Sequence, residues 1–256
     1  MKAPDPYSFS FEPLYLALAA GAALAYVRAA RRERPGPWRA AVFGLGVVLV
    51  ALSVNSPLET LAIHYLLLAH LLQNVMMADW APPLLVLGLT PAMRAAVAHG
   101  LGSAWQLLTR PAVALAIWLV IWVGVHLPVF YDFALRHQVV LNLEHAVLLF
   151  AGLVFWWPVF ADEPQRLSHA TVLAYLGIAF GVSAFLSLAF IFSSGAFYDF
   201  YADAPRIWGL SAAKDQNLAG ILMNGEQLVI FFGAFVYHGL RLLNDEEEAQ
   251  RTVEAR

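Results

Sequence analysis

The sequence predicts an all-α integral membrane protein, a bundle of seven transmembrane helices in a single domain covering residues 1–256. The chain is 61% hydrophobic and only 13% charged, and its mean hydropathy is +0.66, whereas soluble domains are about a quarter charged. Seven apolar stretches have roughly the 20-residue length that spans a bilayer as a helix, and none alternates like a barrel strand. These stretches cover residues 11–30, 39–56, 60–80, 111–130, 139–160, 169–193 and 214–240.

The third stretch requires a break. The predominantly apolar run from Leu61 to Leu89 is longer than one straight span needs. We expect Pro82 and Pro83 to end the helix, because proline lacks the amide donor and clashes with the preceding turn. The segment Pro91–Leu108 has apolar residues at helical spacing, and we expect it to form an amphipathic helix at the membrane interface.

Basic residues predict the orientation of the bundle. Eleven of the fifteen Lys and Arg fall on one side of the predicted spans: Arg28, Arg31, Arg32, Arg34, Arg39, Arg94, Arg110, Arg166, Arg241, Arg251 and Arg256. Because positively charged loops stay in the cytoplasm, we expect a multi-pass protein of the cell (inner or plasma) membrane, with its amino terminus outside and its carboxyl terminus in the cytoplasm. We expect the first stretch to be a span and not a cleavable signal, since its basic cluster follows the apolar run.

Several classes of site are excluded by what the sequence lacks. The chain has no cysteine, which excludes disulfides, thiolate metal sites and cysteine nucleophiles. No nucleotide-binding loop, zinc-protease motif or nucleophile elbow occurs, and no nucleic-acid partner is expected. The lipid bilayer is the expected surrounding of the chain.

Histidines at membrane depth are the main functional signal. At 1.5 Å per residue, His70 lies roughly 13 Å along the third stretch from the outer face, and His145 roughly 9 Å along the fifth. An ionisable side chain at that depth is costly and usually meets a partner or a cavity, so we expect the two imidazoles to share one site. His64 begins the third stretch and His126 ends the fourth, both closer to the outer surface.

Three interpretations of this histidine pair stay open: structural pairing, ligation of a metal or cofactor, and a proton pathway. Imidazole and thioether groups suit copper, and the thioether favours the reduced ion. A deep site of His70, His145 and Met77, with Met223 as a further candidate ligand, would therefore suit Cu(I), and under a copper function His64 and His126 would form an outer entry to it. Met77 shares a helix face with His70, although methionine is also an ordinary filler of apolar packing. Haem is a further alternative, since two histidines on neighbouring helices can supply both axial ligands.

Four sequence blocks between Ser56 and Met223 point to a known family. They are SPLETLAIHYLLLAHLLQN with APPLLVLG, then HLPVFYDFALRHQVVLNLEHAVLLFAGLVFWWPVF, FYDFYA and DQNLAGILM. Together and in this order they resemble the CtaG family of membrane proteins that assist the assembly of cytochrome c oxidase. That resemblance implies a seven-helix membrane bundle associated with building the copper centre of the oxidase.

The resemblance also implies which residues act. The positions that match the family pattern are His64, His70, Gln73, His126, His137, His145 and Asp215. The next histidine of the family's pattern in the third stretch is Asn74 here, and an amide is a poor copper ligand. Either the remaining histidines suffice, or the chain has kept the scaffold and lost the copper chemistry.

The function that the resemblance implies is a membrane-embedded assembly factor, a chaperone that binds or delivers copper for a cytochrome c oxidase of the respiratory chain. Such a protein performs no chemistry on a substrate, so no enzyme is expected. Its partners would be respiratory oxidase subunits or another membrane complex. The alternatives are a non-catalytic structural or accessory subunit of a respiratory complex that has lost the metal site, and a haem-binding membrane protein.

Overall fold

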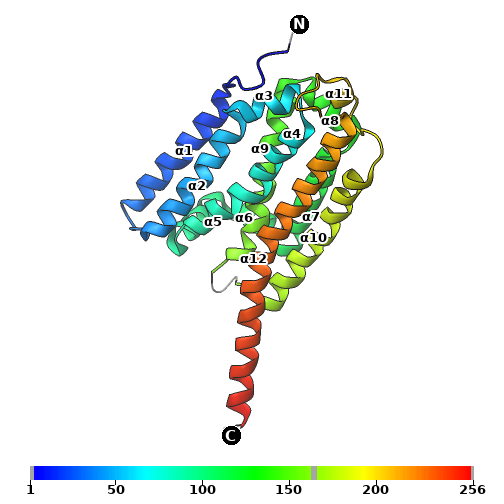
Figure 1. Cartoon of the computed structure of the whole chain (residues 1–256). Helices are drawn as coiled ribbons and strands as arrows, with labels where there is room; N and C mark the ends of the chain where they lie inside the picture. The colour runs from blue at the N-terminus through cyan, green and yellow to red at the C-terminus, as the bar shows by residue number, and fades with distance from the viewer. Residues whose placement is uncertain (1–2, 163–165, 255–256) are drawn as a thin grey trace.

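The computed structural model describes residues 3–162 and 166–254, and within these ranges every regular element is a helix. The predicted all-α fold is therefore confirmed. Helices stand side by side in one bundle, and the two ends of the chain lie at opposite ends of it (Figure 1). The elements in order are α1 (Pro13–Ala30), α2 (Pro37–Val54), α3 (Pro57–His64), α4 (Leu67–Val75), η1 (Met76–Trp80), α5 (Ala81–Gly88), α6 (Pro91–Leu108), α7 (Pro111–Val125), α8 (Pro128–Leu135), α9 (Gln138–Trp156), η2 (Pro158–Phe160), α10 (His169–Phe192), α11 (Asp199–Asp203) and α12 (Ala212–Glu254).

Helix lengths support a protein that crosses a membrane several times. Within the described ranges, five helices are long and apolar enough to cross: α1, α2, α9 with η2, α10 and α12. Two bent pairs raise the number to as many as seven if each pair is one span. These pairs are residues 67–88 with α6, bent by 110°, and α7 with α8, bent by 70°.

Prolines mark many of the helix starts. Six helices, α1, α2, α3, α6, α7 and α8, begin with proline, which suits the first helical position because its missing amide would have no partner there. Serine or threonine side chains add caps: Thr90 accepts from the amide of Met93 at 3.2 Å, and Ser168 from that of Thr171 at 3.2 Å. The sequence therefore carries much of the information that fixes where helices begin.

The third stretch differs from its prediction in two ways. An uninterrupted helix over residues 60–80 was wrong, because the helix breaks at Tyr65 and Leu66, where Leu66 adopts an extended backbone with φ −132° and ψ 124°. A break at Pro82 and Pro83 was also wrong, because the chain continues through them to Gly88. The π-helix η1 precedes both prolines, so they occupy the first turn of α5, where their missing amides are tolerated.

A carboxylate from a distant helix caps the break. Asp215 of α12 accepts hydrogen bonds from the amides of Leu67 and Leu68, at 2.8 and 3.0 Å. These amides begin α4 and have no partner within it, as at any helix start. Asp215 therefore fixes the first turn of α4, the turn that leads to His70, against α12.

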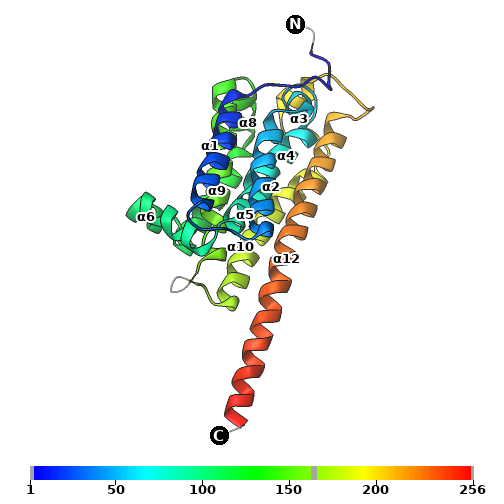
Figure 2. The ribbon, with the colours of Figure 1, turned by 90° about the vertical axis from the view of Figure 1, so that its left-hand side faces the viewer.

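Helix α6 leaves the bundle at a steep angle. It follows α5 after Leu89 and projects to one side of the other helices (Figure 2). Gly102 interrupts it with φ +68° and ψ −155°, a conformation that glycine adopts without a steric penalty. The predicted bounds, Pro91–Leu108, agree with the structure, and the angle suits a helix that lies along a membrane surface.

Aromatic side chains fill the middle of the bundle. Trp118 and Trp122 of α7 stack with their ring centroids 5.3 Å apart, and Phe155 of α9 lies 4.9 Å from Trp118. All three side chains are buried. At Gly152 of α9, an added Cβ would overlap the carbonyl oxygen of Ala78 in η1. The backbones of α9 and η1 therefore approach closely just below the histidines.

Candidate metal centre

Two buried imidazoles meet between α4 and α9. The ring centroids of His70 and His145 lie 5.6 Å apart, with the ring planes at 75°. Both side chains are completely buried. The proximity predicted from their matched depths is confirmed, and it depends on the capped break that sets the position of α4.

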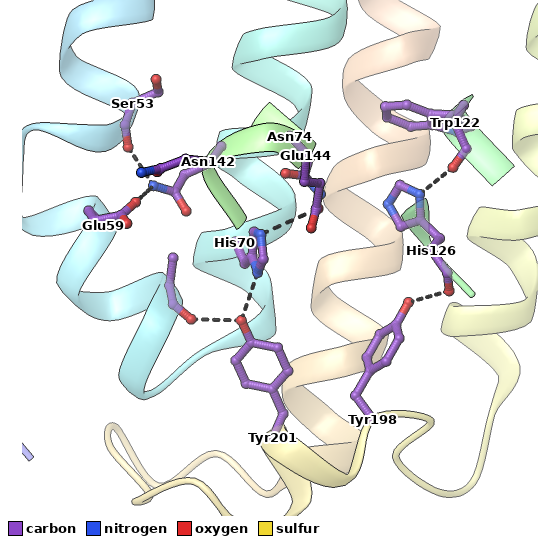
Figure 3. A network of polar contacts seen from close by, with 12 residues as sticks. Ser53, Glu59, His70, Asn74, Trp122, His126, Asn142, Glu144, Tyr198 and Tyr201 are labelled. Carbon is purple, nitrogen blue, oxygen red and sulfur yellow. Dashed lines mark hydrogen bonds and ion pairs between the residues drawn. The ribbon is translucent and has the colours of Figure 1, made fainter. Parts of the chain in front are cut away.

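A tyrosine of the short helix α11 fixes the tautomer of His70. The Tyr201 hydroxyl donates its proton to the carbonyl oxygen of Ala62 at 2.6 Å. It therefore accepts from Nδ1–H of His70, which lies 3.0 Å away. The lone pair of His70 is then on Nε2, which has no hydrogen-bond partner among the described residues. Figure 3 shows this ring between Tyr201 and Glu144, whose Oε1 lies 3.6 Å from Nε2.

Tyr201 is itself held as a neutral hydroxyl. Burial is the main cause that raises the pKa of Tyr201 well above its usual value, and the carboxyl groups of Asp215 and Glu144 raise it further. A neutral phenol has one proton to donate, and Ala62 takes that proton. Partners of this kind on the far ring nitrogen commonly orient metal-binding histidines.

His145 has no hydrogen bond at all among the described residues, because both ring nitrogens are buried without a partner. The ring of Tyr15 on α1 packs edge-on against it, with centroids 6.3 Å apart. Buried polar atoms are nearly always paired, so two orphaned nitrogens on one imidazole call for a ligand. His145 is the strongest sign of a binding site in the molecule.

His126 lies on the far side of the Tyr131 ring from His70 and His145. Its Nδ1–H donates to the carbonyl of Trp122 at 2.6 Å, which leaves a lone pair on Nε2 without a described partner. The Tyr131 ring lies 4.8 Å from that of His70 and 6.0 Å from that of His126. The Tyr131 hydroxyl is also buried without a partner. A second tyrosine, Tyr198, donates to the His126 carbonyl at 2.9 Å (Figure 3).

Carboxylate and amide groups complete the surroundings of His70. Asn74, one turn after His70, donates to Glu144 at 3.2 Å. Glu144 and its neighbour His145 are both buried, so α9 presents an acid and an imidazole together. Sequence reasoning missed Glu144 and the tyrosines. An acidic residue within an apolar span was a signal that could have found the first.

A second set of hydrogen-bonded polar residues, centred on Gln73, lies next to the surroundings of His70. Gln73 donates from Nε2 to Glu59 at 2.5 Å and to the carbonyl of Ser53 at 2.6 Å. Glu59 lies on α3, outside the candidate spans. Burial raises its pKa from 4.5 to about 7, which the hydrogen bond from Gln73 partly opposes. The site thus contains more acid and amide groups than its histidines alone suggested.

The remaining predicted ligands lie further from this pair. His64 is half-buried at the end of α3, across the break from His70, and its ring is 6.4 Å from that of Tyr65. Met77 is buried in the apolar core cluster of the bundle. Within residues 3–162 and 166–254, no three or more His, Cys, Asp or Glu side chains are grouped as a metal site. The structure therefore joins His70 to His145, with His126 across a tyrosine.

The fold and this site define a class of protein: a helical membrane bundle with unpaired imidazoles buried near one end. Comparison with known families is more specific. The sequence profile described as cytochrome c oxidase caa3 assembly factor (CtaG) matches residues 22–245, and the chain belongs to this family. No similar curated protein and no similar solved structure was found.

Proposed function

We propose that this chain is a multi-pass cell-membrane protein that holds Cu(I) reversibly between His70 and His145 and delivers it during assembly of a cytochrome c oxidase. The observation that carries this proposal is the set of buried ring nitrogens without partners: Nε2 of His70 and both nitrogens of His145. Family membership supplies the oxidase. The metal is cargo here, so the proposed protein is a chaperone and not an enzyme.

The ring separation supports an ion between the imidazoles. Metal–imidazole bonds are about 2.0–2.1 Å long and a ring nitrogen lies about 1.1 Å from its centroid, so rings flanking one ion have centroids roughly 6 Å apart. The observed separation is 5.6 Å. Cu(I) accepts a low coordination number, which suits a pair of imidazoles without thiolates. A macrocycle would have to displace Tyr131, whose ring lies 4.8 Å from that of His70, so the geometry favours an ion over haem.

Two further histidines extend the proposed copper path from the buried pair towards one end of the bundle. His126 lies across Tyr131 from His70, and we propose it as the outer station of the same path, with His64 at the surface. Helix α4, which carries His70, lies towards the end of the bundle that carries the chain's amino terminus (Figure 1). With the basic loops at the other end, the amino terminus would be outside, and the site would lie towards the outer face of the membrane.

The histidine pair is tested by copper binding to the purified protein. Wild-type protein should bind Cu(I) in competition with a chromogenic chelator and show nitrogen-dominated X-ray absorption, while His70→Ala and His145→Ala abolish both. His99→Ala is the matched control, because that ring is exposed on α6 and matches no position of the family pattern. Unchanged copper content in both buried-site variants would overturn the proposal.

Tyr201 is tested as a positioning residue. Tyr201→Phe keeps the ring but removes the acceptor for Nδ1–H of His70. Loss of such a partner costs about 10–100-fold in metal affinity, and the nitrogen-dominated absorption spectrum should persist at saturating copper. A spectrum that loses one nitrogen would instead show that Tyr201 does more than orient the ring.

One observation favours a second candidate function, a structural subunit of a respiratory complex. Where the family pattern has a histidine, Asn74 bonds Glu144, and the described residues show no three-ligand cluster. Under this reading the purified protein would carry stoichiometric oxidase subunits and no copper. Copper titration therefore separates the two functions directly.

A further inference from the structure

A large cavity opens at the end of the bundle opposite the histidine pair. Its volume is about 1210 Å³, larger than most small-molecule pockets. Helices α2 and α5 line one side, and α10 and α12 line the other. Trp80 of η1 and Trp156 of α9 lie between them. The proposed copper path does not use this cavity.

Arginines dominate the polar part of the lining. Four of them, Arg39, Arg94, Arg166 and Arg241, line the cavity against a single described acid, Asp162. Asp162 is bound by Arg94, through contacts of 2.7–2.9 Å. The other three arginines form no ion pair within the cavity lining that the structure describes. Asp245 lies 4.0 Å from the lining residue His169, so four arginines face two acids and the cavity presents an excess of positive charge.

These cations are held in place by neutral groups. Arg39 donates to the carbonyls of Leu87 and Leu89, at 2.9 and 2.6 Å. Arg241 lies over the ring of Tyr237, with its Cζ 5.6 Å from the centroid. Neither arrangement neutralises the guanidinium, so both charges remain available to an anion. Each group also keeps further N–H donors.

His169 and its hydrogen-bonded partners add polar groups to the lining of this cavity. Arg166 contacts its Nε2 at 3.2 Å, and its Nδ1 lies 2.8 Å from Nδ1 of His238. Both histidines line the cavity and are largely buried. Helices α10 and α12, with the segment just before α10 that carries Arg166, therefore hold two imidazoles and two arginines within one wall of the cavity.

The rest of the lining is apolar and continues onto the outer surface of the helices. Leu45 of α2 and Val229 of α12 line the cavity and are 50% and 70% exposed. Both lie within helices that can span a membrane. A ligand that fills this cavity would thus have an anionic head and a hydrocarbon tail in contact with the bilayer.

We infer that this cavity binds an anionic membrane phospholipid, with the headgroup phosphate on Arg166, Arg241 and Arg39 and an acyl chain along Leu45 and Val229. Basic pockets between spans on the cytoplasmic side are suited to lipid phosphates, and guanidinium pairs with phosphate in a bidentate manner. A soluble anion would use the arginines and leave the apolar lining unfilled. The inference rests on the membrane location but not on copper, so copper binding and lipid binding can fail separately.

Lipid retention by the purified full chain tests the inference. Protein is reconstituted from vesicles of phosphatidylcholine with phosphatidylglycerol, and the lipids that stay bound are counted by native mass spectrometry. We expect selective retention of phosphatidylglycerol by the wild type. Each basic residue near a membrane surface contributes roughly fivefold, so Arg166→Gln with Arg241→Gln should weaken retention on the order of 30-fold. The corresponding Lys variants keep the charge and should retain the lipid.

A second variant tests the apolar part without changing any charge. Gly233 lines the cavity, and a Cβ there would meet nothing within 4 Å. Gly233→Leu should therefore project into the cavity and lower retention, whereas Gly225→Leu, equally open but outside the lining, should not. Arg110→Gln is the control for charge, because Arg110 is exposed and outside the lining.

Three outcomes would overturn the inference. Equal retention of phosphatidylcholine and phosphatidylglycerol would show that charge does not select the ligand. Retention unchanged by both the arginine and the Gly233 variants would place the lipid elsewhere. Displacement of the lipid by glycerol phosphate at the same concentration would show a site for a soluble anion and not for a phospholipid.

Discussion

Asp215 offers the sharpest test of how the site is built. Its carboxylate accepts from the amides of Leu67 and Leu68 across a sequence separation of 148 and 147 residues. Asp215→Ala removes both acceptors at a completely buried position, so water cannot easily replace them. The first turn of α4 would then lose its only described side-chain cap.

The expected cost follows from the two orphaned donors. A buried donor that loses its partner costs about 1–3 kcal/mol, and part of this is returned because a buried carboxylate no longer has to be desolvated. We therefore expect Asp215→Ala to lower the free energy of unfolding by about 2–4 kcal/mol. Asp215→Asn keeps one acceptor oxygen and should cost roughly half as much.

Asp132→Ala is the matched comparison. Asp132 also accepts from two backbone amides, those of Asp199 and Phe200 at 3.2 and 2.9 Å, but its side chain is partly exposed. Water can replace it, so the expected loss is about 1 kcal/mol or less. Unfolding in mixed micelles, followed by tryptophan fluorescence during detergent titration, measures both variants. Equal losses, or a loss below about 1 kcal/mol for Asp215→Ala, would refute the reasoning.

Three further predictions concern stability. The raised pKa of Glu59, about 7, means that the folded state holds its proton more tightly than the unfolded chain. The contribution of Glu59 to the free energy of unfolding should therefore be largest below pH 4.5 and fall by up to roughly 3 kcal/mol as the pH rises through 7. Glu59→Gln should flatten this part of the profile of unfolding free energy against pH. An unchanged slope would contradict the assignment. Gly152→Ala should cost about 1–3 kcal/mol because its Cβ would overlap η1, whereas Gly124→Ala, with open space around it, should be neutral or stabilising in the same unfolding assay. Tyr131→Phe removes a buried hydroxyl that has no described partner, so it should leave the free energy of unfolding unchanged or raised; a loss above 1 kcal/mol would reveal a partner.

The sequence predicted the helical architecture well, because the signals are local. Apolar stretches of membrane length and prolines at helix starts are readable along the chain, and α1, α2, α9 with η2, and α10 begin and end within about two residues of the predicted stretches. The shared depth of His70 and His145 was equally local, since it needs only the rise per residue of each helix. Differences of up to two residues at the ends of these helices did not affect the placement of the two rings.

The errors in the third stretch have a common cause. Proline was expected to end the helix, but the π-helical turn of η1 puts Pro82 and Pro83 in a first turn, where the missing amides cost little. The real break, at Tyr65 and Leu66, carries no proline or glycine. It is stable because Asp215 satisfies the amides that follow it, and no local pattern reveals a cap on another helix.

Hydrophobicity and helical periodicity are properties of neighbouring residues, and from them the sequence alone predicted an all-helical bundle with several apolar helices of membrane length and two histidines that meet within it. Only the tertiary structure decided which nitrogen of His70 is free, because that depends on Tyr201, 131 residues away. It likewise decided that Glu144 faces His70 and that arginines from four separate segments surround one cavity. Polar contacts between distant segments depend on how whole helices pack, and buried polar groups then take whichever partners that packing brings within reach.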